Sequence, residues 1–394
     1  MKVVQINATC GIGSTGKICV GISEVLTAEN IENYVLCSRS NGYKLAIPCA
    51  DNKYIKLQAL KSKLFGNYGF NSGKATRNII RQLESIKPNI VHLHNIHGHD
   101  CNMGTLFEYF RECGTKLIWT FHDCWAFTGY CPHFTMAKCN KWMRGCFDCS
   151  QRREYSWFFD KSKSLYNKKK SLFEGIDLTI VTPSKWLADI VSESFLEGYP
   201  TYVINNGIDL DVFAPTVSDF RKKYGFENKK LVLGVSFGWD KRKGLDVFIE
   251  LSKRLTDDYK VILVGTDDKI DCVLPDNILS IHRTQNQKEL AEIYSAADVF
   301  VNPTREENYP TVNMESIACG TPVVTFRTGG SPEMLDTTCG SVVECDDVDA
   351  LESEIIRICT DKPYSKESCI KKAAEFDKNE RFKEYLNLYE RINS

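Results

Sequence analysis

Two glutamates in the last third of the chain have a spacing that could serve one ligand. Glu307 lies in a polar segment after an apolar run, and Glu315 lies eight positions later in a helix-like stretch. That stretch begins near Thr311 and Val312, and the first N–H groups of a helix can bind an anion at its electropositive end. We therefore expect both glutamates to line a ligand that carries a pyrophosphate. The alternative is two surface glutamates beside an ordinary helix.

Polar side chains also follow two apolar runs in the first half of the chain. Four of the seven histidines lie between His92 and His99. A further histidine, His122, precedes Asp123 after the next apolar run. Residues at the carboxyl ends of strands point into the crevice of an open α/β sheet, so we expect polar groups there to face a ligand. The cluster could also bind a metal, but His92 alternates with apolar neighbours and is expected to face the core.

Cysteines form a third group, in a segment rich in tryptophan. The pattern is C-x7-C-x6-C-x2-C, made by Cys131, Cys139, Cys146 and Cys149. Four thiolates suit a tetrahedral structural zinc, which would order a long excursion that we expect to cap the acceptor side of the cleft. An iron–sulfur cluster and plain buried thiols are the alternatives. Most of the other cysteines are expected to be small buried hydrophobes in a reducing compartment.

A glycine-rich turn near the N-terminus, from Gly11 through Gly13 to Gly16, matches G-x-G-x-x-G. A nucleotide-triphosphate loop is disfavoured because Ile18 stands where a Ser or Thr should bind magnesium. A dinucleotide site is disfavoured because the second strand ends in Cys-Ser-Arg, without an acidic residue for a ribose. The remaining interpretation is a tight turn that leaves helix N–H groups for an anion or the acceptor.

Short β-branched runs alternate with helix-like stretches along the whole chain, which predicts mostly parallel α/β sheets. The alternation of strand-like and helix-like segments starts again at Leu231, after a polar segment. We therefore expect two Rossmann-like domains facing across a cleft that binds the ligand. The expected parts are an N-terminal acceptor domain at 1–210 with the excursion at about 123–158, a linker at 211–228, a donor-nucleotide domain at 229–375 and a helix crossing back to the first domain at 376–394.

Composition limits the classes of function. The 394 residues are 43% hydrophobic and carry a net charge of −1, so nothing global favours nucleic acid as a partner. No stretch approaches the roughly 20 apolar residues of a membrane helix, and the start resembles a strand rather than a signal peptide. We expect a cytoplasmic protein.

One local stretch is strongly basic. Between Asp51 and Glu84 there is no acidic residue, while seven lysines and arginines accumulate and leucines recur at near-helical spacing. This pattern fits either a solvated helix face or a basic amphipathic patch in peripheral contact with an anionic membrane.

The glutamate pair, with its flanking segments, resembles the E-x7-E signature of the retaining glycosyltransferases of family four, which adopt the GT-B fold. Asn206-Gly-Ile-Asp209, Lys243-Gly244 and the segment from Thr328 to Glu333 follow the order and spacing of that family. The resemblance covers nearly the whole chain, and the combination is more specific than any single motif.

By this resemblance, Glu307 would touch hydroxyls of the donor sugar and Glu315 would bind the ribose. Lys243 would neutralise the pyrophosphate as the leaving group departs. Gly329 and Gly330 would let the backbone approach the donor closely.

The chain departs from the family at one position. An arginine often stands six residues before the lysine, and here the residue is Phe237. Lys241 or Arg242 could replace the missing cation.

A histidine at a strand end touches the donor sugar in this family, which makes His94 and His122 the candidates, with Asp123 beside the latter. The implied reaction moves a hexose from a UDP- or GDP-sugar to a hydroxyl of a glycan or lipid-linked acceptor in polysaccharide assembly. A metal is expected to be dispensable because no D-x-D motif is evident at the site. The alternatives are a non-catalytic nucleotide-sugar-binding protein and a sugar-nucleotide epimerase.

Overall fold

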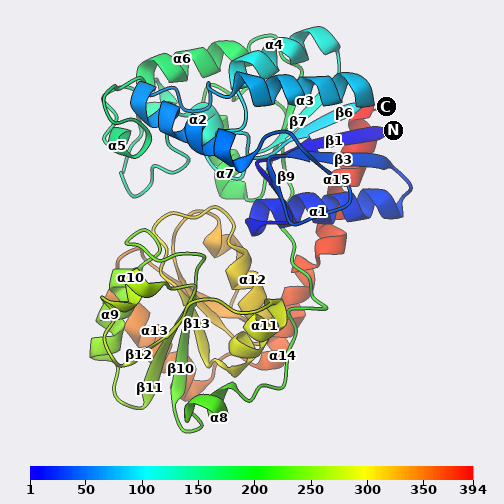
Figure 1. The fold of residues 1–394 in the computed structure, drawn as a ribbon. Coiled ribbons are helices and arrows are strands. Elements are labelled where there is room, and N and C mark those ends of the chain that lie inside the picture. Colours follow the sequence, from blue (N-terminus) through cyan, green and yellow to red (C-terminus); the bar gives the residue numbers. More distant parts are fainter. Residues whose placement is uncertain (394) are drawn as a thin grey trace. The chain divides into compact units, whose positions relative to one another are not determined.

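The structure is a computed structural model that describes residues 1–393. The chain forms two compact units (Figure 1). The first contains Met1–Asn206 together with the residues from Asn379 onward, and the second contains Gly207–Lys378. Each unit has its own parallel sheet, so the prediction of two Rossmann-like α/β domains is confirmed.

The sheet of the first unit has seven parallel strands in the order β5-β3-β1-β6-β7-β8-β9. The strands are β1 (Lys2–Ile6), β3 (Glu32–Cys37), β5 (Ala46–Pro48), β6 (Ile90–Leu93), β7 (Lys116–Thr120), β8 (Leu178–Thr182) and β9 (Thr201–Val203). β6 and β8 are buried along their whole length. Such continuous burial is expected of central parallel strands with both faces covered.

Helices cover both faces of this sheet. On one face α1 (Gly13–Ala28) lies beside the last helix, α15 (Lys378–Asn393) (Figure 1). Phe382, Tyr385 and Tyr389 of α15 are buried there. Burying an aromatic side chain of this kind stabilises the fold by about 1.5–3 kcal/mol. The other face packs against α3 (Gly73–Ile86), α4 (Met103–Cys113) and α6 (Ser162–Phe173). The remaining longer helices of the unit are α2 (Asn52–Phe65) and α7 (Lys185–Ser192).

The cysteine-rich excursion after β7 has little regular structure. Its elements are two 3₁₀ turns, Trp125–Phe127 and Lys141–Met143, and the short α5 (Arg152–Tyr155). A fully buried lysine, Lys169 of α6, holds it: the ammonium donates to the carbonyls of Trp125 (2.6 Å) and Thr128 (3.0 Å). The same ammonium lies 3.6 Å from the centre of the Trp125 ring, a cation–π contact.

The second unit has six parallel strands in the order β12-β11-β10-β13-β14-β15. They are β10 (Lys230–Val235), β11 (Tyr259–Val264), β12 (Ile278–Ile281), β13 (Val299–Asn302), β14 (Val323–Phe326) and β15 (Gly340–Val343). The chain winds outward from β10 in one direction and from β13 in the other. The loops after these two strands therefore diverge, and ligands of open α/β sheets bind at such a switch point.

Two separate cores cover this sheet. One contains buried residues of α11 (Gln287–Ala296), α12 (Thr311–Ala318) and α14 (Lys366–Ala373). The other contains those of α9 (Leu245–Arg254) and α13 (Val348–Asp361).

The segment expected to be a linker, 211–228, lies in the second unit. Phe213 and Phe220 are buried in the core of that unit, and Phe220 starts the short helix α8 (Phe220–Tyr224). Polar residues around these two aromatics made the segment resemble a join, although the aromatics anchor it.

Candidate functional site

The switch point of the second unit carries the residues of the E-x7-E region. The loop after β10 runs to Gly244 and the loop after β13 contains Glu307. Gly244 has a φ of +78°, and a Cβ there would lie 2.5 Å from the carbonyl oxygen of Pro303. Only a glycine lets the two loops approach so closely.

An ion pair joins the two loops. The ammonium of Lys243 donates to the Glu307 carboxylate at 2.5 Å, and each side chain is about one-fifth exposed. The structure thus brings together two residues that are 64 positions apart and that the sequence had assigned to one ligand. A cation and an anion in partial contact with solvent can bind phosphate oxygens and sugar hydroxyls, respectively.

Gly329 closes the same site from a third loop, the one after β14. Its φ is +56°, and a Cβ would lie 1.9 Å from the carbonyl oxygen of Glu307. The next amide, Gly330 N–H, donates to the carbonyl of Asn308 at 2.7 Å. The two glycines therefore fix the backbone that carries Glu307.

Glu315 lies in the middle of α12 and is half-buried. The hydroxyl of Tyr294, on α11, donates to its carboxylate at 3.2 Å. Burial first, and then the charge of Glu315, raise the pKa of Tyr294 well above its ordinary value, which keeps the hydroxyl protonated as a donor. α12 begins at Thr311 and has no side-chain cap at its start.

The cations of the loop after β10 have different environments. Phe237, at the position where the family often has arginine, is 96% exposed. Lys241 is exposed, and Arg242 is half-buried with its Nε 3.9 Å from the Asp240 carboxylate. Neither contacts Glu307 in the way that Lys243 does.

Sequence analysis missed Arg305, whose side chain is only 10% exposed. Its guanidinium binds Asp246 of α9 at 2.8 and 3.0 Å and Asp346 at 2.6 Å, and it also donates to the carbonyl of Lys241. The backbone N–H of Arg305 donates to the carbonyl of Arg242 at 2.8 Å. Arg305 therefore anchors the Glu307 loop to the Lys243 loop. Its place two residues before Glu307 was the only signal in the sequence.

In the first unit, histidines gather at the carboxyl ends of β6 and β7. His94 is buried and its two ring nitrogens contact Gln5 at 3.1 Å and His122 at 3.0 Å. His122 is half-buried and stacks on His94. Burial lowers the pKa of both rings, that of His122 to about 4. The pair is therefore neutral at pH 7, with His94 positioned behind His122.

His92 is fully buried, as its alternation with apolar residues predicted. Its ring contacts the hydroxyls of Tyr389 at 2.6 Å and Thr120 at 2.8 Å, so it ties α15 to the sheet.

Asp123 pairs with His97, which sequence analysis had not selected. The two side chains are 3.2 Å apart, and the carboxylate also accepts the backbone N–H of Trp125 at 2.8 Å. Burial acts to raise the pKa of Asp123, but the charge and hydrogen bond of His97 outweigh it and the pKa falls to about 2. His97 also stacks on Trp125. Asp123 is an ionised anchor for this loop.

The glycine-rich turn lies in the first unit, after β1 and at the start of α1. Gly13 is exposed and α1 begins there without a side-chain cap. Gly16 is buried, and its carbonyl accepts the N–H of Gly11 at 2.9 Å. The turn is tight, with an exposed helix start.

The four cysteines share one neighbourhood, since the pKa of Cys131 is raised by burial first and then by the other three thiols. A tetrahedral zinc needs sulfurs about 3.8 Å apart. Within residues 1–393, the one set of three metal-ligating side chains whose ligand atoms all lie within 4.8 Å of one another is the exposed group Asp268, Asp271 and His282. In this part of the chain no three of the four cysteine sulfurs lie within 4.8 Å of one another, so the zinc site stays a prediction.

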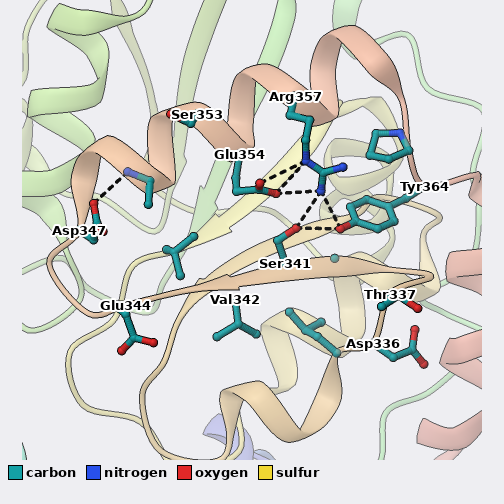
Figure 2. Close-up of a pocket in the computed structure, with 15 residues that line it drawn as sticks. Asp336, Thr337, Ser341, Val342, Glu344, Asp347, Ser353, Glu354, Arg357 and Tyr364 are labelled. Carbon is teal, nitrogen blue, oxygen red and sulfur yellow. Dashed lines mark hydrogen bonds and ion pairs between the residues drawn. The ribbon is translucent and has the colours of Figure 1, made fainter.

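A cavity of about 870 Å³ in the second unit lies apart from these residues, between β15 and α13. Figure 2 shows Arg357 on α13 directed at Glu354, Ser341 and Tyr364. None of the predicted site residues lines this cavity, and its arginine is already paired.

No helix among residues 1–393 combines the length and apolarity needed to cross a bilayer.

Comparison with known proteins follows the same division of the chain. Residues 16–212 match the family model "Glycosyltransferase Family 4", and residues 217–380 match the model "Glycosyl transferases group 1". Together the two models span both units.

Two relatives illustrate the similarity in sequence. The putative colanic acid biosynthesis glycosyl transferase WcaC of Escherichia coli K12 is 24% identical over 344 residues, which covers 84% of this chain and 81% of the relative. A GDP-mannose-dependent phosphatidylinositol monomannoside mannosyltransferase of Mycolicibacterium smegmatis is 33% identical over 170 residues, which covers 38% of this chain and 44% of the relative.

Solved structures share the fold. Sucrose-phosphate synthase from Thermosynechococcus elongatus has a TM-score of 0.73 at 17% identity, covering 100% of this chain and 99% of that chain. HepE of Anabaena, in complex with UDP-glucose, has a TM-score of 0.67 at 15% identity, covering 98% and 99%. These neighbours have the GT-B fold of glycosyltransferases, which is the fold that the motifs predicted.

Proposed function

This chain belongs to glycosyltransferase family 4, and we propose that it moves a hexose from a nucleoside-diphosphate sugar to a hydroxyl of a glycan or lipid-linked acceptor. The observation that carries the proposal is the Lys243–Glu307 ion pair at the switch point of the second unit, 2.5 Å long and partly exposed. This pair supports the proposal because a cation can bind phosphate, an anion can bind hydroxyls, and open α/β sheets bind ligands at such a switch point.

The proposed roles follow from the chemistry of each side chain. Glu307 accepts hydroxyl hydrogens of the donor sugar, and Glu315 accepts those of the ribose. Lys243 and the start of α12 at Thr311 and Val312 bind the pyrophosphate. The lysine stabilises the charge that grows on the leaving oxygen, which is the step where a fixed cation lowers the barrier most.

We propose that transfer retains the anomeric configuration. The bond between the anomeric carbon and the phosphate oxygen breaks, and the acceptor oxygen bonds to the same face of that carbon. The acceptor hydroxyl's proton passes to the leaving phosphate, so no protein nucleophile is needed. Of the two candidate histidines, we assign the sugar contact to His122, because it is half-buried whereas His94 is covered and bonded behind it.

The donor is proposed to be a UDP- or GDP-sugar. HepE was solved with UDP-glucose, and the mannosyltransferase relative is named for GDP-mannose. The relative WcaC, named for colanic acid biosynthesis, supports a role in polysaccharide assembly. We propose that no metal is required, since Lys243 supplies positive charge beside Glu307.

A structural zinc in the excursion is a separate proposal, supported by two details. The N–H of Gly129 donates to the sulfur of Cys146 at 3.2 Å, a bond that suits a thiolate. Between Cys146 and Cys149, Asp148 has a φ of +43°, which makes the tight C-x-x-C turn. Zinc would draw the four sulfurs together and order a segment that has little regular structure.

The test is a donor screen. Purified protein is incubated with UDP-, GDP- and ADP-sugars, and release of nucleoside diphosphate is measured with and without added hydroxyl acceptors. Release from one donor that is lost in Glu307→Ala supports the transferase, and NMR of the product's anomeric centre tests retention. Conversion of the donor sugar without diphosphate release would instead indicate an epimerase. Tight nucleotide binding with no release under any condition would indicate a binding protein.

A further inference from the structure

Several apolar side chains of helix α2 are exposed to solvent, whereas a helix that packs only on its own domain would bury them. Leu57, Leu60 and Phe65 are each 45–53% exposed. The buried positions are polar: Gln58 and Ser62 face the protein, and the side-chain amide oxygen of Gln58 accepts the backbone N–H of Ser72 at 3.4 Å. Surface helices of globular proteins normally have the opposite arrangement. The outward leucines need an explanation outside the domain core.

Lysines flank this apolar stripe. Lys53, Lys56 and Lys61 are exposed. At 100° per residue, Lys56 and Lys61 lie on either side of the stripe through Leu57 and Leu60, and Lys53 lies within it. The acidic residue at the helix start, Asp51, is engaged as its cap and accepts the N–H of Tyr54 at 2.8 Å. The outward face therefore combines leucine with positive charge.

A second exposed apolar segment lies at the end of the same helix. Trp157, Phe158 and Phe159 are consecutive and 51–64% exposed. The N–H of Trp157 donates to the carbonyl of Lys63 at 2.8 Å, and the ammonium of Lys63 donates to the carbonyl of Glu154. These bonds fix the aromatic segment against α2.

The interior also holds this segment in place. The hydroxyl of the buried Tyr130 donates to the carbonyls of Gly66 at 3.2 Å and Phe159 at 3.4 Å. Of the nearby acids, Asp160 accepts the N–H groups of Cys149 and Ser162, and Glu154 is exposed. Three exposed aromatics in a fixed segment are a built surface rather than a chance exposure.

We propose that these residues form a docking face for an anionic lipid bilayer. The docking face consists of Leu57, Leu60 and Phe65 with Trp157, Phe158 and Phe159, together with Lys53, Lys56 and Lys61. Aromatic side chains settle at the level of lipid headgroups, and leucines of an interfacial helix enter the acyl boundary. Lysines beside them are attracted to anionic headgroups. Such a bilayer matches both the apolar and the charged parts of the face.

The consequence for catalysis rests on the proposed function. A bilayer at this face would hold the first unit beside lipid-linked acceptors, so vesicles should raise transfer to such acceptors without changing donor hydrolysis. Binding to vesicles is independent of that step and can be measured without any donor.

The experiment is cosedimentation of the full chain with lipid vesicles. The anionic probe is phosphatidylcholine containing 30% phosphatidylglycerol, and the neutral probe is pure phosphatidylcholine. We expect binding to the anionic vesicles only. Each lysine reversed to glutamate should weaken it about fivefold or more, in line with the attraction of one basic residue to an anionic surface. Trp157→Ser combined with Phe158→Ser should weaken it at least tenfold.

Matched control variants distinguish vesicle binding by this face from a general effect of the protein's charge. Lys222→Glu, Lys223→Glu and Lys253→Glu change the same charge at exposed positions of the second unit and should leave binding intact. Trp157→Phe should keep vesicle binding but lose the fluorescence quenching by brominated lipid that the wild type shows. Thermal unfolding of every variant checks that it is folded.

Equal binding to neutral vesicles, equal loss in the control triple, or no binding at all would overturn the proposal. So would a dimer in gel filtration that dissociates in the Trp157→Ser, Phe158→Ser variant without vesicle binding by the wild type, because a second copy would then cover the face. Failure of donor hydrolysis with normal vesicle binding would count against the proposed transferase and not against the docking face.

Discussion

The ammonium of Lys243 lies 2.5 Å from the carboxylate of Glu307, and the pair joins the two loops that diverge at the switch point of the second sheet. A partly exposed pair of this kind contributes little to stability, about 1 kcal/mol or less. Under the proposed function, its value lies in holding a cation and an anion in position for a donor that needs both.

Removing the cation should reduce turnover strongly. Lys243→Ala is expected to lower kcat for nucleoside diphosphate release about 10²- to 10³-fold, the usual cost of losing one preorganised electrostatic group. Thermal stability should change little. Lys241→Ala is the matched control, because Lys241 is an exposed lysine of the same loop and should stay within threefold of wild type. Equal losses in both variants would show that Lys243 has no special position.

Arg305 gives a test of how the loops are aligned. Arg305→Lys keeps the charge but loses the two parallel bonds to Asp246, so the Glu307 loop should shift relative to Lys243. We expect a loss of about 1.5–3 kcal/mol in the free energy of unfolding and at least a tenfold loss in kcat/KM. Arg327→Lys, which alters an exposed pair with Glu344, is the control and should be nearly silent in both measurements.

Gly329 tests the close approach of backbone to backbone. Gly329→Ala should cost about 1–2 kcal/mol of stability from its left-handed φ alone, and its Cβ would also displace the Glu307 carbonyl. Gly225→Ala has a similar φ of +69° and open space, so it isolates the backbone term. Activity should fall in Gly329→Ala and persist in Gly225→Ala. If the two variants had equal activity, the contact with Glu307 would not control catalysis.

The proposed zinc can be measured directly. Protein purified without chelator should contain about one zinc per chain, and Cys146→Ser with Cys149→Ser should lose it together with order in the excursion. Cys272→Ser, at an exposed cysteine elsewhere, should keep its metal. Full stability of the Cys146→Ser, Cys149→Ser variant, with no metal in the wild type, would leave these residues as ordinary thiols.

Sequence reasoning was most reliable where one local pattern determines the structure. The alternation of β-branched runs with helix-like stretches predicted parallel sheets, and β6 and β8 are two such runs, buried along their whole length. The short β15 (Gly340–Val343) is a strand because it pairs with β14, and such pairing cannot be read from the local sequence. Segment 211–228 was assigned to a linker because two buried aromatics cannot outweigh its polar composition in a local window.

The site divides in the same way. The sequence predicted that Lys243 and Glu307 belong to one site, because both residues lie in motifs that have the spacing of the family. The roles of Arg305 and His97 were not, since each is defined by partners distant in sequence, such as Asp246 and Asp346 for Arg305. The solvent exposure of individual side chains is known only from the structure. It distinguishes the half-buried His122 from the covered His94, and it shows that the leucines Leu57 and Leu60 of α2 are exposed.

The histidines predict how stability depends on pH. Burial keeps the folded pKa of His94 well below 6.5 and that of His122 at about 4, so the unfolded chain binds more protons than the folded chain in mildly acidic solution. The contribution of these two rings to the free energy of unfolding should therefore be constant above about pH 7 and fall as the pH drops from 6.5 toward 4. The slope is about 1.4 kcal/mol per pH unit for each additional proton bound by the unfolded chain. Urea unfolding followed by tryptophan fluorescence at a series of pH values measures it. His122→Asn should reduce the slope by up to one proton, whereas His282→Asn, at an exposed histidine whose pKa is raised by its bond to Asp271, should not. A slope that is unchanged in His122→Asn would mean that this ring is protonated in the folded protein.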